Sequence, residues 1–157
     1  MIEKLVEQWH RVVEGDADLL PDLLADDVVF YSPVVFTPQR GQDTTLLYLQ
    51  GAAQVLNAGG FTYIKQVLAG YTAVLEFETT VDGKHVNGVD IITGNAQGQI
   101  VEFRVMLRPL QAIHLVHPKL GELLARACGS VRTAHCFPSQ AVRMPRLFHD
   151  PPSRRGC

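Results

Sequence analysis

A single carboxylate lies in the middle of an apolar segment of this chain. Asp90 stands between Val89 and Ile91 in the segment VNGVDIIT, residues 86–93. Removal of a carboxylate from water disfavours its charged form, so its pKa rises and the neutral acid becomes a hydrogen-bond donor. Such a donor suits the carbonyl or developing oxyanion of a substrate. Asp90 is therefore the first candidate for chemistry. The alternative is a structural carboxyl that accepts hydrogen bonds from a tyrosine or a backbone amide.

Other reactive residue types form weaker patterns. His114 and His117 have the i, i+3 spacing of two ligands on one helix face. No third ligand stands nearby, so we expect surface histidines and no metal site. His10 lies off the apolar stripe of its segment and is expected to face solvent. No glycine-rich nucleotide loop, HExxH or GxSxG motif occurs, and we expect the protein to act without a cofactor.

Length and composition indicate one globular domain. The chain has 157 residues, of which 46% are hydrophobic and 19% charged, enough for a sizeable core. It has no apolar run of transmembrane length and no signal-peptide pattern, so we expect no membrane association and a cytoplasmic location. Residues 1–125 hold 8 Lys and Arg against 15 Asp and Glu, and this acidic balance disfavours nucleic acid as a partner.

Hydrophobic periodicity predicts helices first and strands later. Apolar residues at helical spacing predict a helix over residues 2–14, and Asp16 is the expected cap of a short second helix. Asp43 is the expected cap of a third helix that ends near Ala58. Strands are expected at 28–31, 61–69, 71–81, 85–93 and 99–108, followed by a short helix with Ile113, Leu115, Leu120 and Leu123 as its apolar members. Short turns such as 82–84 predict an antiparallel meander.

This order predicts an α+β domain over residues 1–125. A strongly curved antiparallel sheet wrapped around about three N-terminal helices would make a cone-shaped α+β barrel with an apolar interior.

The remaining residues, 126–157, form an irregular basic tail. The tail has six Arg against one Asp, four Pro, and all three cysteines. The spacing of Cys128, Cys136 and Cys157 fits no zinc module, and their odd number argues against a disulfide framework. One hypothesis is that the tail is read-through into non-coding sequence, as in a mobile gene cassette (an integron cassette). The other is a C-terminal arm that lies over a partner subunit.

Several segments, taken in order, resemble a known superfamily. They are Gly15-Asp16 after the first helix, LLADDVVFYSP at 23–33, a Gly-initiated third helix, and GQIVEFRVMLRP at 98–109. Residues 1 to about 120 resemble the nuclear-transport-factor-2-like superfamily, also called the SnoaL-like or cystatin-like α+β barrel. That superfamily contains ketosteroid isomerases, limonene epoxide hydrolases, scytalone dehydratase and polyketide cyclases. It also contains non-catalytic ligand binders and dimerisation modules, so the fold alone does not define the function.

The resemblance implies a role for some residues and leaves other positions unmatched. Asp90 falls on the isomerase acid that donates to the substrate oxyanion. The position of the isomerase base, directly before a proline, holds Ser32, which cannot act as an enolising base. The tyrosine of the isomerase first helix would fall at Gln8 or Trp9, and Tyr48 falls at a cavity-lining aromatic position. We therefore expect Asp90 to be the central group, assisted by Tyr48 and Ser32, with Trp9 as a further candidate.

Strand alternation predicts which side chains face the interior. Val105 falls near the position of the last-strand acid of the epoxide hydrolases, so the match to that class is partial. The expected cavity-lining residues are Trp9, Phe30, Leu75, Phe77, Thr79, Ile92, Phe103, Val105 and Leu107. The same alternation directs Val89, Ile91 and Met106 outward. An outer sheet face that is this apolar predicts a homodimer.

The sequence thus favours a small-molecule enzyme of the SnoaL-like type. We expect cofactor-free acid–base chemistry, as in an isomerase, a cyclase or an epoxide-hydrolase-like enzyme, on a small, mostly apolar, oxygen-bearing substrate. The alternatives are a non-catalytic binder of a small hydrophobic ligand and a dimerisation module.

Overall fold

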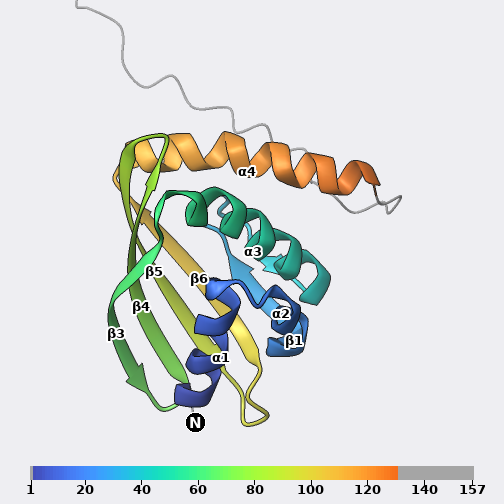
Figure 1. Ribbon diagram of the computed structural model, residues 1–157. Helices are drawn as coiled ribbons and strands as arrows, with labels where there is room; N and C mark the ends of the chain where they lie inside the picture. The colour runs from blue at the N-terminus through green and yellow to red at the C-terminus, as the bar shows by residue number, and fades with distance from the viewer. Residues whose placement is uncertain (1, 131–157) are drawn as a thin grey trace, which may run out of the picture.

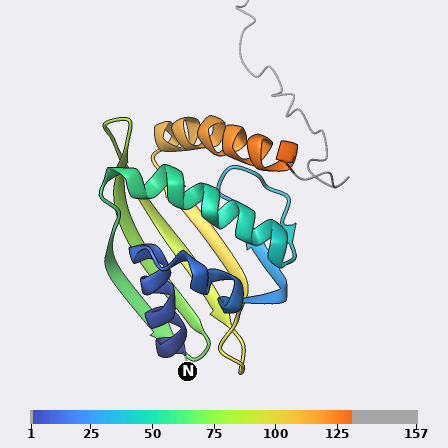
Figure 2. The same cartoon turned by 45° about the vertical axis from the view of Figure 1, so that its right-hand side comes forward.

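The computed structural model describes residues 2–130, with the side chains of residues 2–126. Helices pack against one face of a single curved sheet of six strands (Figures 1 and 2). The two edge strands do not meet, so the sheet forms an open cone. The expected α+β class and cone-shaped fold are confirmed. The tail beyond residue 130, with Cys136 and Cys157, lies outside the described residues.

The elements follow the predicted order, with helices first and a strand meander later. The helical elements are α1 (Ile2–Glu14), the 3-10 turn η1 (Ala17–Leu19), α2 (Leu20–Leu23), α3 (Gln42–Leu56), the 3-10 turn η2 (Asn57–Gly59) and α4 (Leu110–Ser130). The strands are β1 (Leu24–Tyr31), β2 (Gln39–Arg40), β3 (Thr62–Ala69), β4 (Thr72–Val81), β5 (Lys84–Gly94) and β6 (Ile100–Arg108).

The sheet has the order β2-β1-β6-β5-β4-β3, and its last four members form the expected antiparallel meander. The turn between β4 and β5 consists of Asp82 and Gly83, whose φ angles of 50° and 72° suit a two-residue hairpin. The pairing of β1 with β6 differs from expectation because it is parallel. A parallel pair needs a long connection, which α3 and the strands β3 to β5 provide here.

Three helix boundaries differ from the sequence prediction. The N-cap of α3 is Gly41, with a φ of 92°, so Asp43 instead occupies the first turn. Its negative charge there interacts favourably with the positive end of the helix dipole. Asp16 precedes η1 but makes no capping bond, because its Oδ2 accepts a 2.6 Å hydrogen bond from Arg11. The last helix is longer than expected: α4 continues past residue 125 to Ser130. Its buried residues recur every four positions and form one face: Ala112, Val116, Leu120 and Leu124.

The helices all lie on the concave side of the sheet. In both views α1, α2 and α3 lie on the same face of the sheet, and α4 runs beside α3 at one end (Figures 1 and 2). α3 and α4 approach closely at Gly51, where a Cβ atom would lie 2.9 Å from Leu120 Cδ1. The face of the sheet away from these helices is not covered by any described element.

Gly88 makes room for bulky neighbours on the inner face of the sheet. It lies between Phe77 of β4 and Leu107 of β6 in the strand register. A Cβ atom on Gly88 would lie 2.8 Å from Leu107 Cδ2 and closer still to the Phe77 ring. The Phe77 ring therefore occupies the space that a side chain at position 88 would fill. An aromatic ring on the neighbouring strand commonly covers a glycine in this way.

We expect Gly88→Ala to destabilise the protein. The added methyl group must displace the buried Phe77 ring and the partly buried Leu107 side chain, and overpacking of this kind costs about 1–3 kcal/mol. Urea denaturation followed by circular dichroism measures the change. Gly121→Ala in α4 is the control, since no atom lies within 4 Å of its Cβ position and alanine favours a helix by about 1 kcal/mol over glycine. Equal stability of the Gly88→Ala variant and the wild type would contradict this packing.

Candidate functional site

Asp90 lies on the inner face of β5 and is 5% exposed. Its cross-strand neighbours are Leu75 of β4 and Val105 of β6. The adjacent residues Val89 and Ile91 are half-buried and face the other way. The carboxyl group is therefore surrounded by apolar side chains of its own sheet.

Two hydrogen bonds in series connect Asp90 to the first helix. The hydroxyl of Tyr63 on β3 donates to Asp90 Oδ2 at 2.6 Å. The indole Nε1 of Trp9 on α1 in turn donates to the Tyr63 hydroxyl at 2.7 Å. Three elements that are distant in the sequence thus meet at one buried polar chain.

Burial shifts the titration of both acids in this chain. Loss of hydration raises the pKa of Asp90 from an ordinary value of 3.8 to about 7, and the hydrogen bond from Tyr63 opposes part of that rise. Burial, followed by the adjacent Asp90 charge and the hydrogen bond to it, holds the pKa of Tyr63 well above its ordinary value. Near neutral pH, Asp90 therefore populates both its acid and its carboxylate form, whereas Tyr63 stays protonated.

Aromatic contacts fix the orientation of the Tyr63 ring. His10 stacks on it with the ring centroids 5.2 Å apart, and Phe61 meets it edge-on at 5.0 Å. Phe77 makes a second edge-on contact at 6.3 Å. The expectation that His10 faces solvent is wrong, because the ring is half-buried and its Nε2 is buried without a hydrogen-bond partner. His10 lies off the main apolar stripe of α1, but the Tyr63 ring that stacks on it shields it from solvent.

A pocket of about 110 Å³ lies between the sheet and the helices. We call it the Asp90 pocket. Its walls come from α1, α3, α4 and the inner sheet face, and most of the residues that line it are apolar. Its polar lining residues are Trp9, Gln50, Asn57, Tyr63 and Asp90. The pocket has room for a small apolar group beside the Asp90 carboxyl, whose pKa burial raises to about 7.

The structure brings six of the expected cavity-lining residues to this pocket. They are Trp9, Phe30, Phe77, Phe103, Val105 and Leu107. Three others are buried in the core but do not line it. Leu75 and Ile92 are fully buried, and Thr79 donates its hydroxyl to the Leu56 carbonyl at 2.6 Å.

The two expected helpers of Asp90 lie outside the pocket lining. Ser32 follows β1, and its hydroxyl accepts a 3.3 Å hydrogen bond from the Val34 amide, which makes it part of a local turn. Tyr48 of α3 is buried against Phe30 with ring centroids 5.4 Å apart, and burial raises its pKa. Neither side chain forms a hydrogen bond with Asp90.

Tyr63 is the site residue that the sequence did not single out. Simple alternation along β3 would place Tyr63 and Lys65 on the same face. The register shifts between these two residues, so Tyr63 pairs with Phe77 on the inner face, whereas Lys65 pairs with Glu76 on the outer face. A bulge of this kind re-aims one side chain. The two consecutive polar residues Lys65 and Gln66, which break the two-residue alternation after Tyr63, are the sequence signal for it.

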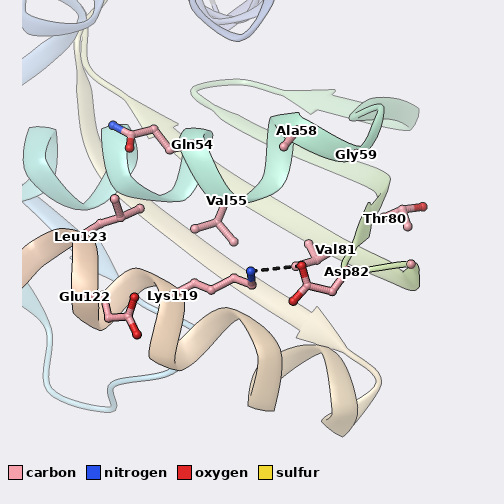
Figure 3. A pocket seen from close by; sticks show the side chains of 11 residues that line it. Gln54, Val55, Ala58, Gly59, Thr80, Val81, Asp82, Lys119, Glu122 and Leu123 are labelled. Carbon is pink, nitrogen blue, oxygen red and sulfur yellow. Dashed lines mark ion pairs between the residues drawn. The ribbon is translucent and has the colours of Figure 1, made fainter.

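A wider hollow of about 490 Å³ lies between α3, α4 and the β4–β5 turn (Figure 3). Lys119 of α4 extends towards Asp82 in the turn, and its Nζ lies 3.1 Å from Asp82 Oδ1. This ion pair is about half exposed, and its two charges satisfy one another. Despite its larger volume, the hollow has no buried titratable group, so we place the candidate site at the Asp90 pocket.

Residues 2–130 contain neither a metal-binding cluster nor a membrane-spanning helix. In this part of the chain, no three His, Cys, Asp or Glu side chains are arranged to hold a metal ion. His114 and His117 are exposed on α4. None of the helices described is long and apolar enough to cross a membrane.

The family is shown by sequence comparison. Residues 2–103 match the model of the SnoaL-like domain, and the chain belongs to this family. The matched segment contains Trp9, Tyr63 and Asp90, the three members of the hydrogen-bond chain. Among curated proteins, none matches this chain.

Solved structures with the same fold include enzymes and uncharacterised proteins. A steroid delta-isomerase from Pseudomonas aeruginosa is 30% identical, with a TM-score of 0.76 over 82% of this chain and 94% of that one. An uncharacterised protein with a cystatin-like fold from Silicibacter pomeroyi is 28% identical, with a TM-score of 0.74 over 80% and 88%. The epoxide hydrolase/cyclase-like enzyme SalBIII, of pyran ring formation in salinomycin, is 20% identical, with a TM-score of 0.55 over 68% and 89%, and shares the fold alone.

The raised pKa of Asp90 predicts a pH dependence of stability. The folded protein binds this proton more tightly than the unfolded chain does. The resulting stabilisation is fully present below about pH 3.8 and is lost as the pH rises to about 7. Between these values the free energy of unfolding should fall by up to about 1.4 kcal/mol per pH unit.

Asp90→Asn has no carboxyl at this position and should lose that slope. Denaturant unfolding of both proteins from pH 4 to 8 gives the two profiles, and their difference isolates Asp90 from the other acids. Parallel profiles would mean that the carboxyl is hydrated or charge-paired, contrary to the structure.

Proposed function

We propose that this protein is a cofactor-free acid–base enzyme acting on a small, mostly apolar substrate with a carbonyl or similar oxygen. The observation that carries the proposal is the carboxyl of Asp90, buried in the wall of an apolar pocket with its pKa raised by burial to about 7. A general acid–base group works best when its pKa lies near the working pH. Buried acids of this kind occur preferentially at functional sites.

The pocket volume limits the size of the substrate. About 110 Å³ is somewhat less than the roughly 150 Å³ of an engineered apolar cavity that holds benzene. A single small ring or a short branched chain fits such a space, whereas the four fused rings of a steroid exceed it. Although a steroid isomerase is among the similar structures, the geometry here favours a monocyclic or short acyclic carbonyl compound.

One carboxyl can perform an isomerisation by moving one proton. In the carboxylate form, Asp90 removes a proton from the carbon next to a carbonyl, and the electron pair of that C–H bond passes into an enolate. The neutral acid then returns the proton to a second carbon of the conjugated system, and Asp90 recovers its starting form. Atoms and charge balance without any other reactant.

A second candidate function is binding without catalysis. Apart from Asp90 and Tyr63, the polar residues that line the pocket are Trp9 and the amides Gln50 and Asn57, which transfer no protons. An enolate formed in this pocket has few donors to stabilise it. A carrier of a small hydrophobic ligand needs only the apolar walls and one hydrogen bond to Asp90.

Deuterium exchange separates the two functions. Wild-type protein in D₂O with 2-cyclopentenone should accelerate exchange at the carbons activated by the carbonyl, as followed by proton NMR. Asp90→Asn should lower that acceleration by about 10²-fold or more. Asp82→Asn makes the same chemical change at an exposed carboxyl outside the pocket and should leave the rate unchanged.

The outcomes distinguish enzyme, binder and neither. Chemical-shift changes of pocket residues without exchange would favour the binder. Neither exchange nor shift changes with 2-cyclopentenone would refute both functions for this ligand class. A bulky steroid enone should show neither effect, and exchange with it at a rate equal to that of the small enone would contradict the size limit.

We also propose a homodimer formed through the outer sheet face. Five apolar residues form a stripe across the strands on this face: Val67, Val74, Val89, Ile91 and Met106. Val67 of β3 and Met106 of β6 are 56% and 52% exposed, an unusual state for two large apolar side chains on the same face of a sheet. Charges of both signs flank the stripe, such as Glu102 and Arg104, which pair at 3.3 Å. A second copy of the same face would cover the stripe and offer complementary charges.

Charge insertion tests this interface. Val89→Asp and Ile91→Asp should each shift the protein to monomer, because an unpaired carboxylate would be desolvated between the subunits. Analytical ultracentrifugation measures the mass. Ala58→Asp adds the same charge at an exposed position of η2 and should leave the mass unchanged. If the wild type sediments as a monomer, or both stripe variants stay dimeric, this interface is wrong.

A further inference from the structure

We propose that Trp9 and Tyr63 form a directional hydrogen-bond chain that reserves one oxygen of Asp90, so that Oδ1 alone exchanges protons with the contents of the pocket. Tyr63 would be a positioning residue that acts through Asp90, and Trp9 would position Tyr63. The inference concerns the site of the proposed function and rests on that function only for the ligand.

The direction of the chain follows from the chemistry of its members. An indole N–H can only donate, so the Tyr63 hydroxyl must accept from Trp9 Nε1 at 2.7 Å. The hydroxyl carries a single hydrogen, which it donates to Asp90 Oδ2 at 2.6 Å. Reversal at the Trp9 end is excluded, because the indole nitrogen has no lone pair to offer. Reversal at the Asp90 end would deprive the phenol hydrogen of Asp90 Oδ2, its acceptor in this structure, and a buried donor without a partner is costly.

The consequence for Asp90 concerns the position of its proton. Oδ2 accepts from Tyr63 in both charge states of the carboxyl, which makes it the carbonyl-like oxygen of the neutral acid. The acidic hydrogen is then carried by Oδ1. Within residues 2–126, no hydrogen bond is made to Oδ1, and Asp90 lines the pocket, so this oxygen is available to a ligand.

The surrounding rings hold the chain in this arrangement. Tyr63 is stacked on His10 and meets Phe61 edge-on, and Trp9 meets Phe103 edge-on at 4.8 Å. A ring fixed on several sides cannot swing its hydroxyl into the pocket without losing these contacts. Within residues 2–126, Tyr63 is the titratable group that acts on Asp90, and His10 stacks on the Tyr63 ring.

The chain should also tune Asp90. A donor to the carboxylate stabilises the charged form, and polarisation along connected hydrogen bonds strengthens that donor. Removal of the Tyr63 hydroxyl should therefore raise the pKa of Asp90. Removal of the Trp9 donor should raise it by less, because Tyr63 remains but is polarised less.

The test measures the titration of Asp90 and needs no substrate. In protein with ¹³C-labelled aspartate, Tyr63→Phe should raise the pKa of Asp90 by about one pH unit, as expected for the loss of one hydrogen bond. Trp9→Phe should raise it by less. The double variant should match Tyr63→Phe alone, because Trp9 acts only through the hydroxyl.

Two further proteins keep the test decisive. Tyr48→Phe removes another buried hydroxyl, outside the pocket lining, and should leave the titration of Asp90 unchanged. Incorporation of 3-fluorotyrosine at position 63 makes the phenol a stronger donor with little change in shape, and should lower the pKa of Asp90. This arm remains informative if Trp9→Phe fails to fold.

Infrared spectroscopy locates the proton. Below the pKa of Asp90, the carbonyl stretch of the neutral acid should move to higher frequency in Tyr63→Phe, because Oδ2 loses its hydrogen bond. The proposal is overturned if Tyr63→Phe changes only stability and leaves both titration and carbonyl stretch as in wild type. It is also overturned if the effects of Trp9→Phe and Tyr63→Phe are additive. Failure of the exchange assay with intact titration effects would reject the proposed function and leave this inference standing.

Discussion

The hydrogen bond between Tyr63 and Asp90 is the interaction on which the rest of the site depends. Burial between apolar strands makes the Asp90 carboxylate unfavourable, and the difference between an ordinary pKa of 3.8 and about 7 corresponds to roughly 4 kcal/mol. Without a donor the cost would be higher still, since the phenol opposes the effect of burial. Burial thus disfavours the Asp90 carboxylate, and the hydrogen bond from Tyr63 stabilises it enough to keep the pKa near neutrality.

Three local features of the fold make that contact geometrically available. The bulge in β3 turns Tyr63 inward while Lys65 stays on the outer face. The absence of a side chain at Gly88 lets the Phe77 ring lie beside Tyr63. The buried face of α1 then places the Trp9 indole where its N–H donates to the Tyr63 hydroxyl oxygen. Each feature is a backbone or packing detail, and together they place a chain of hydrogen bonds inside an otherwise apolar core.

The sequence predicts the fold well because its signals are periodic. Helical spacing in α1, the Asp82-Gly83 turn and two-residue alternation in β5 each depend on local rules, and alternation alone placed Asp90 on the inner face. The partners of Asp90 were not predictable in this way. Tyr63 reaches Asp90 through a register shift, and a shift depends on pairing between strands rather than on either strand alone. The parallel pairing of β1 with β6 was not predicted either, because it too depends on which strands meet in the sheet.

α4 supplies part of the pocket wall, whereas the acid and its hydrogen-bond donors come from earlier in the chain. The segment that matches the SnoaL-like family ends at residue 103, after Trp9, Tyr63 and Asp90. Val116 and Leu120 of α4 form part of the pocket wall from beyond that segment, and Leu120 is held tightly against Gly51 of α3. Part of the pocket wall is therefore encoded beyond the stretch that supplies the acid and its donors, although most of the lining comes from within that stretch. Substitutions at Val116 or Leu120 would change the shape of the pocket while Asp90, Tyr63 and Trp9 stay unaltered.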